Sequence, residues 1–125
     1  TPLYHQAVHF GELKDGLIRG SRFDKTVERE FASFLSDKKD EDIINLCKSL
    51  GGEIIKSKFD LSVVFYLFPN YPVTLNIWFA DDEFGAVGSM LVDKSADNYL
   101  TIEDDVVAGE FMLRYIFERY NELYM

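Results

Sequence analysis

Two strand-like segments joined by a proline-containing turn restrict the fold more than any other part of the sequence. Residues 61–68 are apolar at nearly every position, which suits a central strand covered on both faces. Pro69 and Pro72 border a turn that excludes a helix. In residues 73–80, apolar side chains recur at every second position, as in a half-buried strand. Because connections this short join antiparallel neighbours, the sequence predicts an antiparallel hairpin here.

Strand patterns also lie on both sides of this hairpin. Residues 53–58 precede it, and residues 86–92 follow it after an acidic turn. Residues 3–10 show no clear period and fit either an extended edge or a short helix. The strand segments predict a meander of three or four strands. We expect the apolar side chains of residues 73–79, Trp78 included, to hold this sheet to the helices.

Three segments have the apolar spacing of amphipathic helices. The first is predicted over residues 25–36, with Asp24 as its N-cap, after a glycine-containing stretch that reads as a loop. The second follows Asp40, which can cap it, and ends at a pair of glycines. The third is predicted from residue 102 to about residue 124.

The third helix begins with a capping-box pattern and is apolar around most of its circumference. Thr101 and Asp104 supply the capping box, and the first turn is acidic, the favourable sign for a helix N-terminus. One apolar face comprises Val106, Leu113 and Phe117. A second set is apolar too, and comprises Val107, Phe111 and Tyr115. A single sheet face cannot cover both sets, so we expect a protein partner or self-association through this C-terminal helix.

Together these elements predict an α+β fold, with an antiparallel three- to four-stranded meander packed against two short helices and a long C-terminal helix. The 125 residues suffice for a single α+β domain over residues 1–125. Because the chain starts with Thr1 rather than Met, we expect it to be a processed product or a fragment, such as the C-terminal part of a longer chain.

The charge balance restricts the partners. The net charge is -9 and the pI is near 4.6, so nucleic acid and membrane surfaces are disfavoured because both repel an acidic protein. No apolar run approaches the roughly 18 residues of a membrane span, and no signal peptide is evident, so we expect a cytoplasmic protein. The single cysteine excludes an internal disulfide and a four-thiolate metal site.

Several short motifs follow one another in fixed order over residues 71–110. A proline precedes an apolar strand ending in Trp78, an Asp-Glu-Phe turn follows at residues 82–84, and the next strand ends in Asp93. Tyr-Leu and Glu-Asp pairs then open the last helix. In this order and spacing the chain resembles an uncharacterised prokaryotic family, domain-of-unknown-function family 3786, met mostly in anaerobes.

The resemblance implies kinship and fold, and it implies no chemistry. Some relatives carry an N-terminal four-cysteine iron–sulfur segment of the kind seen in corrinoid proteins. This chain lacks those cysteines, so no cluster carries over. It also has Gly85 and Ala86 where the family pattern usually has prolines.

Two classes of function remain open. The first is a non-catalytic binding or accessory module of anaerobic metabolism, which agrees with the lack of a nucleophile–base pair and with the fusions seen in the family. The second is a small enzyme that uses the acidic turn of Asp81, Asp82 and Glu83, beside Trp78, for acid–base chemistry on a small molecule. Crowded carboxylates can raise one pKa and retain a proton. An ordinary solvated turn would show the same charges.

Aromatic side chains are abundant, and they could fill a core or form a face for a partner or a flat cofactor. One group is expected at one end of the meander: Tyr66, Phe68, Tyr71, Trp78 and Phe84. A second group lines the last helix: Phe111, Tyr115, Tyr120 and Tyr124.

Three further patterns carry no predicted site. One echoes an EF-hand loop and comprises Asp93, Ser95, Asp97 and Asp104. It lacks the central glycine and the terminal glutamate of that motif. His5 and His9 lack the glutamate of a zinc-protease helix, and Cys47 reads as a buried thiol. The sequence therefore predicts no metal site and no cofactor, and it leaves catalytic residues unassigned.

Overall fold

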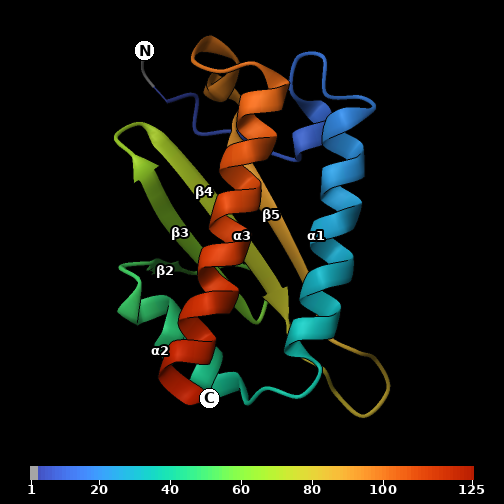
Figure 1. The fold of residues 1–125 in the computed structure, drawn as a ribbon, viewed down its shortest axis with the longest axis vertical. Coiled ribbons are helices and arrows are strands. Elements are labelled where there is room, and N and C mark those ends of the chain that lie inside the picture. The colour runs from blue at the N-terminus through green and yellow to red at the C-terminus, as the bar shows by residue number, and fades with distance from the viewer. Residues whose placement is uncertain (1–2) are drawn as a thin grey trace.

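The computed structural model describes residues 3–125, and in this range five strands form one antiparallel sheet with three α-helices (Figure 1). The spatial order of the strands is β1-β5-β4-β3-β2. In chain order they are β1 (Ala7–Val8), β2 (Glu53–Ile55), β3 (Leu61–Phe68), β4 (Tyr71–Trp78) and β5 (Val87–Asp93). The predicted meander is confirmed, with β1 added at one edge.

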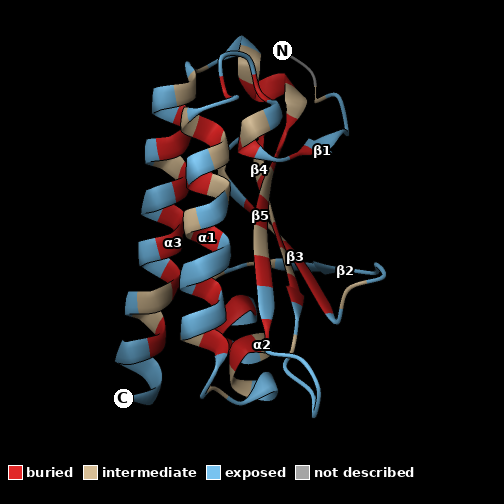
Figure 2. Cartoon of the chain, turned by 90° about the vertical axis from the view of Figure 1, so that its right-hand side faces the viewer, coloured by how far each residue is buried: buried red, intermediate tan, exposed pale blue. Residues whose placement is uncertain are grey.

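The helices lie on one face of the sheet. They are α1 (Arg19–Leu35), α2 (Asp40–Ser49) and α3 (Ile102–Tyr124), with two short 3-10 helices, η1 (Phe10–Glu12) and η2 (Lys94–Asn98). The long helices α1 and α3 run side by side over the sheet, and α2 lies near the C-terminal end of α3 (Figures 1 and 2). The α+β class and the long C-terminal helix are therefore confirmed.

The core lies between the sheet and these helices. Along β4 the side chains of Val73, Leu75 and Ile77 are buried, and the residues between them are less so. Their cross-strand neighbours on β3 are Phe65, Val63 and Leu61, which are buried too. Figure 2 shows α1 and α3 along one side of the strands that carry these buried residues. The period-two pattern of β4 therefore identified the core face of the sheet. The expectation that residues 61–68 form a strand covered on both faces is wrong, because Tyr66 and Phe68 of β3 are exposed.

A glycine allows the two long helices to approach each other closely. Gly109 lies in the middle of α3, and a Cβ atom there would come within 2.6 Å of the Phe23 ring on α1. A real Cβ does not approach another carbon so closely, so any larger residue would push α3 away from α1.

The expected caps of the first two helices are wrong. Asp40 is the first residue of α2, and Lys39 occupies the N-cap position. Helix α1 begins at Arg19, so Asp24 lies inside it and is not its N-cap. The Asp24 carboxylate instead accepts hydrogen bonds from the backbone N–H groups of Phe10 (3.0 Å) and Gly11 (2.9 Å). Gly20, which suggested a loop, lies in the first turn of α1, where a Cβ would stand 2.3 Å from the Phe10 carbonyl oxygen. The glycine therefore serves the contact with η1.

Two strand boundaries also differ from the expectation. Strand β2 ends at Ile55 rather than near residue 58. The chain turns there, and the Ser57 hydroxyl accepts a hydrogen bond from the Phe59 N–H (3.1 Å). Residues 3–10, for which two readings were open, contain both a short edge strand and the first residue of η1.

Trp78 does not hold the sheet to the helices. It lies on the face opposite the core, 40% exposed, with its ring 5.1 Å from that of Phe59. Strict alternation from buried Ile77 requires this placement. The expected single aromatic cluster is also wrong, because β4 separates Tyr71, which stacks on Phe68, from Trp78 by its whole length.

Within residues 3–125, no helix combines the length and the apolar composition that a bilayer crossing requires.

Candidate functional site

The outer face of α3 carries an exposed apolar stripe, here called the α3 stripe, formed by Val107, Phe111 and Tyr115. Their exposed fractions are 60%, 65% and 45%, whereas Val106 and Leu113 on the inner face are buried. The four-residue spacing places the three side chains above one another along the helix. The rings of Phe111 and Tyr115 are nearly parallel, with centroids 6.1 Å apart. The expectation that these residues lie outside the core is confirmed.

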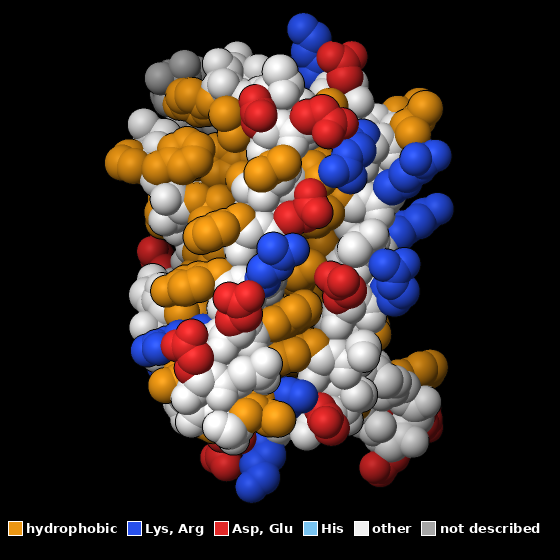
Figure 3. Space-filling view, in the orientation of Figure 1, with side chains coloured by type: hydrophobic (Ala, Val, Ile, Leu, Met, Phe, Trp, Pro, Cys, Tyr) orange, Lys and Arg blue, Asp and Glu red, His pale blue; other side chains and the backbone are white. Residues whose placement is uncertain are grey.

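Charged side chains border the α3 stripe. A shallow hollow along the helix is lined by Val107, Glu110, Phe111, Arg114, Tyr115 and Glu118. The charges in this list alternate in sign along the helix. Figure 3 shows hydrophobic side chains interspersed with acidic and basic ones over this surface. Arg114 makes no hydrogen bond or ion pair with any residue that the structure describes, so its charge is available to a partner.

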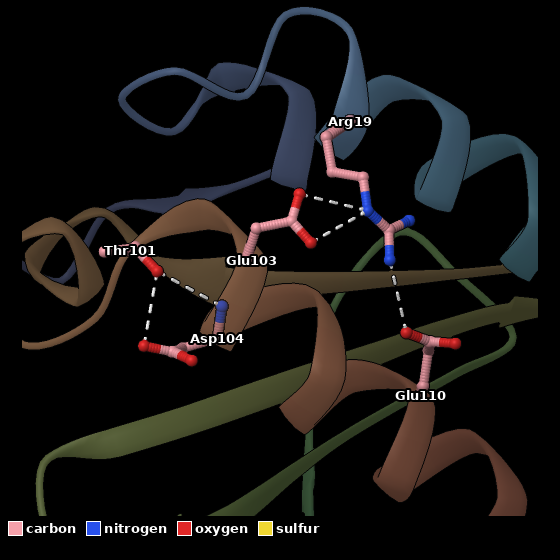
Figure 4. A network of polar contacts seen from close by, with 5 residues as sticks. All are labelled: Arg19, Thr101, Glu103, Asp104 and Glu110. Carbon is pink, nitrogen blue, oxygen red and sulfur yellow. Dashed lines mark hydrogen bonds and ion pairs between the residues drawn. The ribbon is translucent and has the colours of Figure 1, made fainter.

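A polar network at the top of α3 fixes the helix against α1 (Figure 4). Arg19 lies between two carboxylates of α3, with its Nε 3.3 Å from Glu103 and a terminal nitrogen 3.5 Å from Glu110. The predicted N-cap is confirmed, since the Thr101 hydroxyl accepts a hydrogen bond from the Asp104 N–H at 3.4 Å. The Asp104 carboxylate accepts from the Thr101 hydroxyl at 3.2 Å and not from the Thr101 backbone N–H, so the second half of the predicted capping box is not formed. The α3 stripe therefore lies on a helix whose start and position are both fixed.

The acidic turn has a structural role at its first residue. One oxygen of Asp81 accepts hydrogen bonds from the backbone N–H groups of Glu83 and Phe84, both 2.8 Å long. These two bonds lower the pKa of Asp81, so this carboxyl holds no proton for acid–base work at neutral pH. Asp82 and Glu83 are exposed beside it.

No helix of residues 3–125 covers the other face of the sheet (Figure 2). A hollow there is lined by Leu3, His5, Ala7, Ile55, Val64, Tyr66, Pro72, Thr74 and Asp93. Its acidic residue is already engaged, because Asp93 accepts hydrogen bonds from the backbone N–H groups of Tyr4 and Gln6, both 2.9 Å long. These bonds, with those from Ser95, hold the pKa of Asp93 below its ordinary value although its burial acts to raise it.

The acidic residues of the EF-hand-like pattern have separate structural roles. Asp93 anchors the N-terminal segment, as described above. Asp97 accepts from the Lys14 backbone N–H at 2.9 Å and pairs with Lys94 at 2.8 Å. Asp104 belongs to the helix cap. These contacts give each carboxylate a structural partner within the protein.

The remaining sequence candidates do not converge on one site. His5 lines the hollow on the outer sheet face, whereas His9 lines a different hollow beside Asp24. Cys47 is buried in α2, and desolvation raises its pKa to about 12. A thiol with so high a pKa is a poor nucleophile at neutral pH.

One polar pair was not foreseen from the sequence. Asp105 is fully buried, and its Oδ1 accepts a 2.6 Å hydrogen bond from the Tyr71 hydroxyl. Sequence reasoning took Asp105 as part of the acidic first turn of α3. The only local signal was its position directly before buried Val106.

The family model "Domain of unknown function (DUF3786)" matches residues 1–115 of the chain. The chain belongs to this family. The DUF3786 match agrees with the resemblance seen over residues 71–110, and it includes both the acidic turn and the α3 stripe. No curated protein and no solved structure matches the chain.

Proposed function

We propose that the chain is a cytoplasmic, non-catalytic binding or accessory module of anaerobic metabolism, and that it binds a protein chain, another protein or a second copy, through the α3 stripe. The single observation that carries the proposal is the exposure of Val107, Phe111 and Tyr115 on a helix whose inner face is part of the core. The anaerobic setting comes from the resemblance alone.

The chemistry of the stripe supports a protein as the ligand. Two stacked aromatic rings and a valine offer apolar contact area, and the charges beside them offer directional contacts. Interfaces are enriched in aromatic residues and arginine, which is the composition of this surface. The hollow is shallow and extends along one helix, so it suits a helix or strand laid against it better than a small molecule.

The acidic turn supports an enzyme less well. An acid–base catalyst needs a carboxyl group with a pKa near the working pH. Asp81 has the opposite shift, for the structural reason given above. The residues near it supply no nucleophile activated by a base.

The test compares native complexes formed in the protein's own host under anaerobic conditions. Tagged wild type, Phe111→Glu and a control variant are purified and examined by native mass spectrometry. Leu17→Glu is the matched control, because Leu17 is 81% exposed and lies outside the stripe. We expect wild type and Leu17→Glu to retain a second chain in fixed stoichiometry and Phe111→Glu to lose it, with similar melting temperatures. A bound chain that survives Phe111→Glu, or wild type without any bound chain, would overturn the proposal.

A further inference from the structure

We propose that the chain on the α3 stripe is a second copy of this protein, packed antiparallel about a two-fold axis at Phe111. This inference rests on the proposed function and identifies the partner. Three observations carry it: the symmetry of the stripe, the positions of the charges beside it, and the unpaired Arg114.

The stripe is symmetric about Phe111. Val107 lies four residues before it and Tyr115 four residues after it, which is about 6 Å along the helix in each direction. A two-fold axis at Phe111 therefore brings Val107 opposite the partner's Tyr115. It also brings Phe111 opposite the partner's Phe111. All three apolar side chains of one copy then meet apolar side chains of the other.

The charges on the α1 side of the stripe are complementary in this arrangement. When two helices pack antiparallel about a two-fold axis, the α1 side of one helix lies next to the α1 side of the other. The two helices run in opposite directions. Arg114 lies three residues after the axis and Glu110 one residue before it. Arg114 therefore comes within about 3 Å, measured along the helix, of the partner's Glu110. Within one copy Glu110 also pairs with Arg19, whose terminal nitrogen lies 3.5 Å away.

The other side of the stripe is complementary too. Arg119 lies eight residues after the axis, and Asp104 lies seven residues before it. In the dimer, Arg119 of one copy and the partner's Asp104 therefore lie within about 2 Å of each other, measured along the helix axis. Each copy thus brings Arg114 to the partner's Glu110, and brings Arg119, which also pairs with Glu122 of its own copy at 2.9 Å, to the partner's Asp104.

Parallel packing lacks these contacts. Parallel packing would place Glu118 beside the partner's Glu118 and Asp104 beside the partner's Asp104, whereas the antiparallel axis brings Glu118 level with the partner's Asp104. Both arrangements therefore oppose carboxylates, and only the antiparallel one adds the contact of Arg114 with the partner's Glu110. Parallel packing would also align the two acidic first turns, which the antiparallel arrangement separates. Antiparallel helices gain in addition from their opposed dipoles. The net charge of -9 on each copy opposes association, but salt at physiological strength screens charges beyond about 8 Å.

Cysteine cross-linking tests the register directly. Purified Phe111→Cys, Val107→Cys and Tyr115→Cys proteins are treated with a short bis-maleimide, and Leu17→Cys serves as the control for random collisions. Native Cys47 is buried and contributes little background. We expect Phe111→Cys to form a covalent dimer alone. Val107→Cys should form one only when mixed with Tyr115→Cys, since two copies of residue 107 are about 12 Å apart along the helices.

Two results would overturn the arrangement. One is a mixture of Val107→Cys and Tyr115→Cys that cross-links no better than Leu17→Cys. The other is Val107→Cys that cross-links with itself as efficiently as the mixture, which would indicate parallel packing.

Sedimentation of untreated protein tests the energetics. We expect wild type to shift from the 14.5 kDa monomer to a dimer as its concentration rises. Phe111→Glu should remain monomeric, and Arg114→Glu should weaken the dimer at least about tenfold. A purely monomeric wild type overturns the second copy as partner. The proposed function is then tested by the native complexes alone, because Phe111→Glu would also release a different protein bound at the α3 stripe.

Discussion

The Tyr71 hydroxyl donates a 2.6 Å hydrogen bond to Asp105 Oδ1 inside the core, which joins the first residue of β4 to the first turn of α3. The second carboxylate oxygen of Asp105 is buried without a hydrogen-bond partner among the described residues. Burial raises the pKa of Asp105 to about 6, and the charges of Asp97 and Asp104 add to the rise, while the Tyr71 hydrogen bond acts against it. Burial and the Asp105 contact also raise the pKa of Tyr71.

Asp105 is expected to make the protein more stable in mild acid. Its carboxyl titrates near pH 6 when folded and near 3.8 when unfolded, so the folded state binds more protons between these values. The contribution of Asp105 to the free energy of unfolding should therefore be largest below about pH 4 and should be lost as the pH rises through 6, by up to about 3 kcal/mol. Asp105→Asn should remove this fall, which urea denaturation at several pH values will measure.

Comparing wild type with Asp105→Asn separates the titration of Asp105 from that of other groups, such as Asp24. Burial raises the pKa of Asp24 too. Asp82→Asn is the control, since it changes an exposed carboxylate. If wild type and Asp105→Asn lose stability in parallel from pH 4 to 7, the carboxyl group is not titrating in the core.

Gly109→Ala is expected to destabilise the fold by about 1–2 kcal/mol. Alanine favours a helix over glycine by about 1 kcal/mol, but the new methyl group would collide with the Phe23 ring, and such overpacking costs typically 1–3 kcal/mol. Gly85→Ala is the control, because no atom lies within 4 Å of its Cβ position. Thermal melts of both variants decide the matter, and a melting temperature for Gly109→Ala at or above that of wild type would contradict the close approach of α1 and α3.

The two faces of the sheet should respond differently to a charge. Ile77→Asp places a carboxylate in the core without a partner and should unfold the domain. Val87→Asp places the same group on the exposed outer face and should change stability by less than about 1 kcal/mol. Circular dichroism of the two variants measures the contrast. Equal effects would mean that the outer face is covered as well.

Thr101→Ala should cost about 1 kcal/mol through loss of the N-cap acceptor for the Asp104 N–H. Thr101→Ser retains the hydroxyl and should stay within a few tenths of a kcal/mol of wild type. Chemical denaturation midpoints report both effects. Coincident midpoints for the alanine and serine variants would show that the hydroxyl does not stabilise the start of α3.

Much of the fold followed from local patterns. The hairpin of β3 and β4 was evident from a turn that excludes a helix and from alternation of side chains. Helix α3 was evident from its cap and its long run without proline. The same alternation places Trp78 on the sheet face opposite that of Ile77, so the expectation that Trp78 holds the sheet to the helices was wrong.

The candidate site was foreseen only in part. An excess of apolar residues around α3 indicated that one side would remain uncovered, and the α3 stripe is that side. The acidic turn was identified as a cluster of charges, but the hydrogen bonds that lower the pKa of Asp81 depend on the folded shape of the turn. Nothing in the sequence indicated a role for Arg114 except its position three residues after Phe111.

The sequence by itself determined which segments form the three helices and the four strands of the meander, though not all of their boundaries, and which side of β4 is apolar, because these depend on the geometry of neighbouring residues along the backbone. Tertiary structure alone decided which apolar side of α3 is covered, which backbone groups Asp24 binds, and that Asp105 meets Tyr71. The last two residues are 34 positions apart in the chain. Contacts of this kind depend on how whole elements pack, and no local period records them.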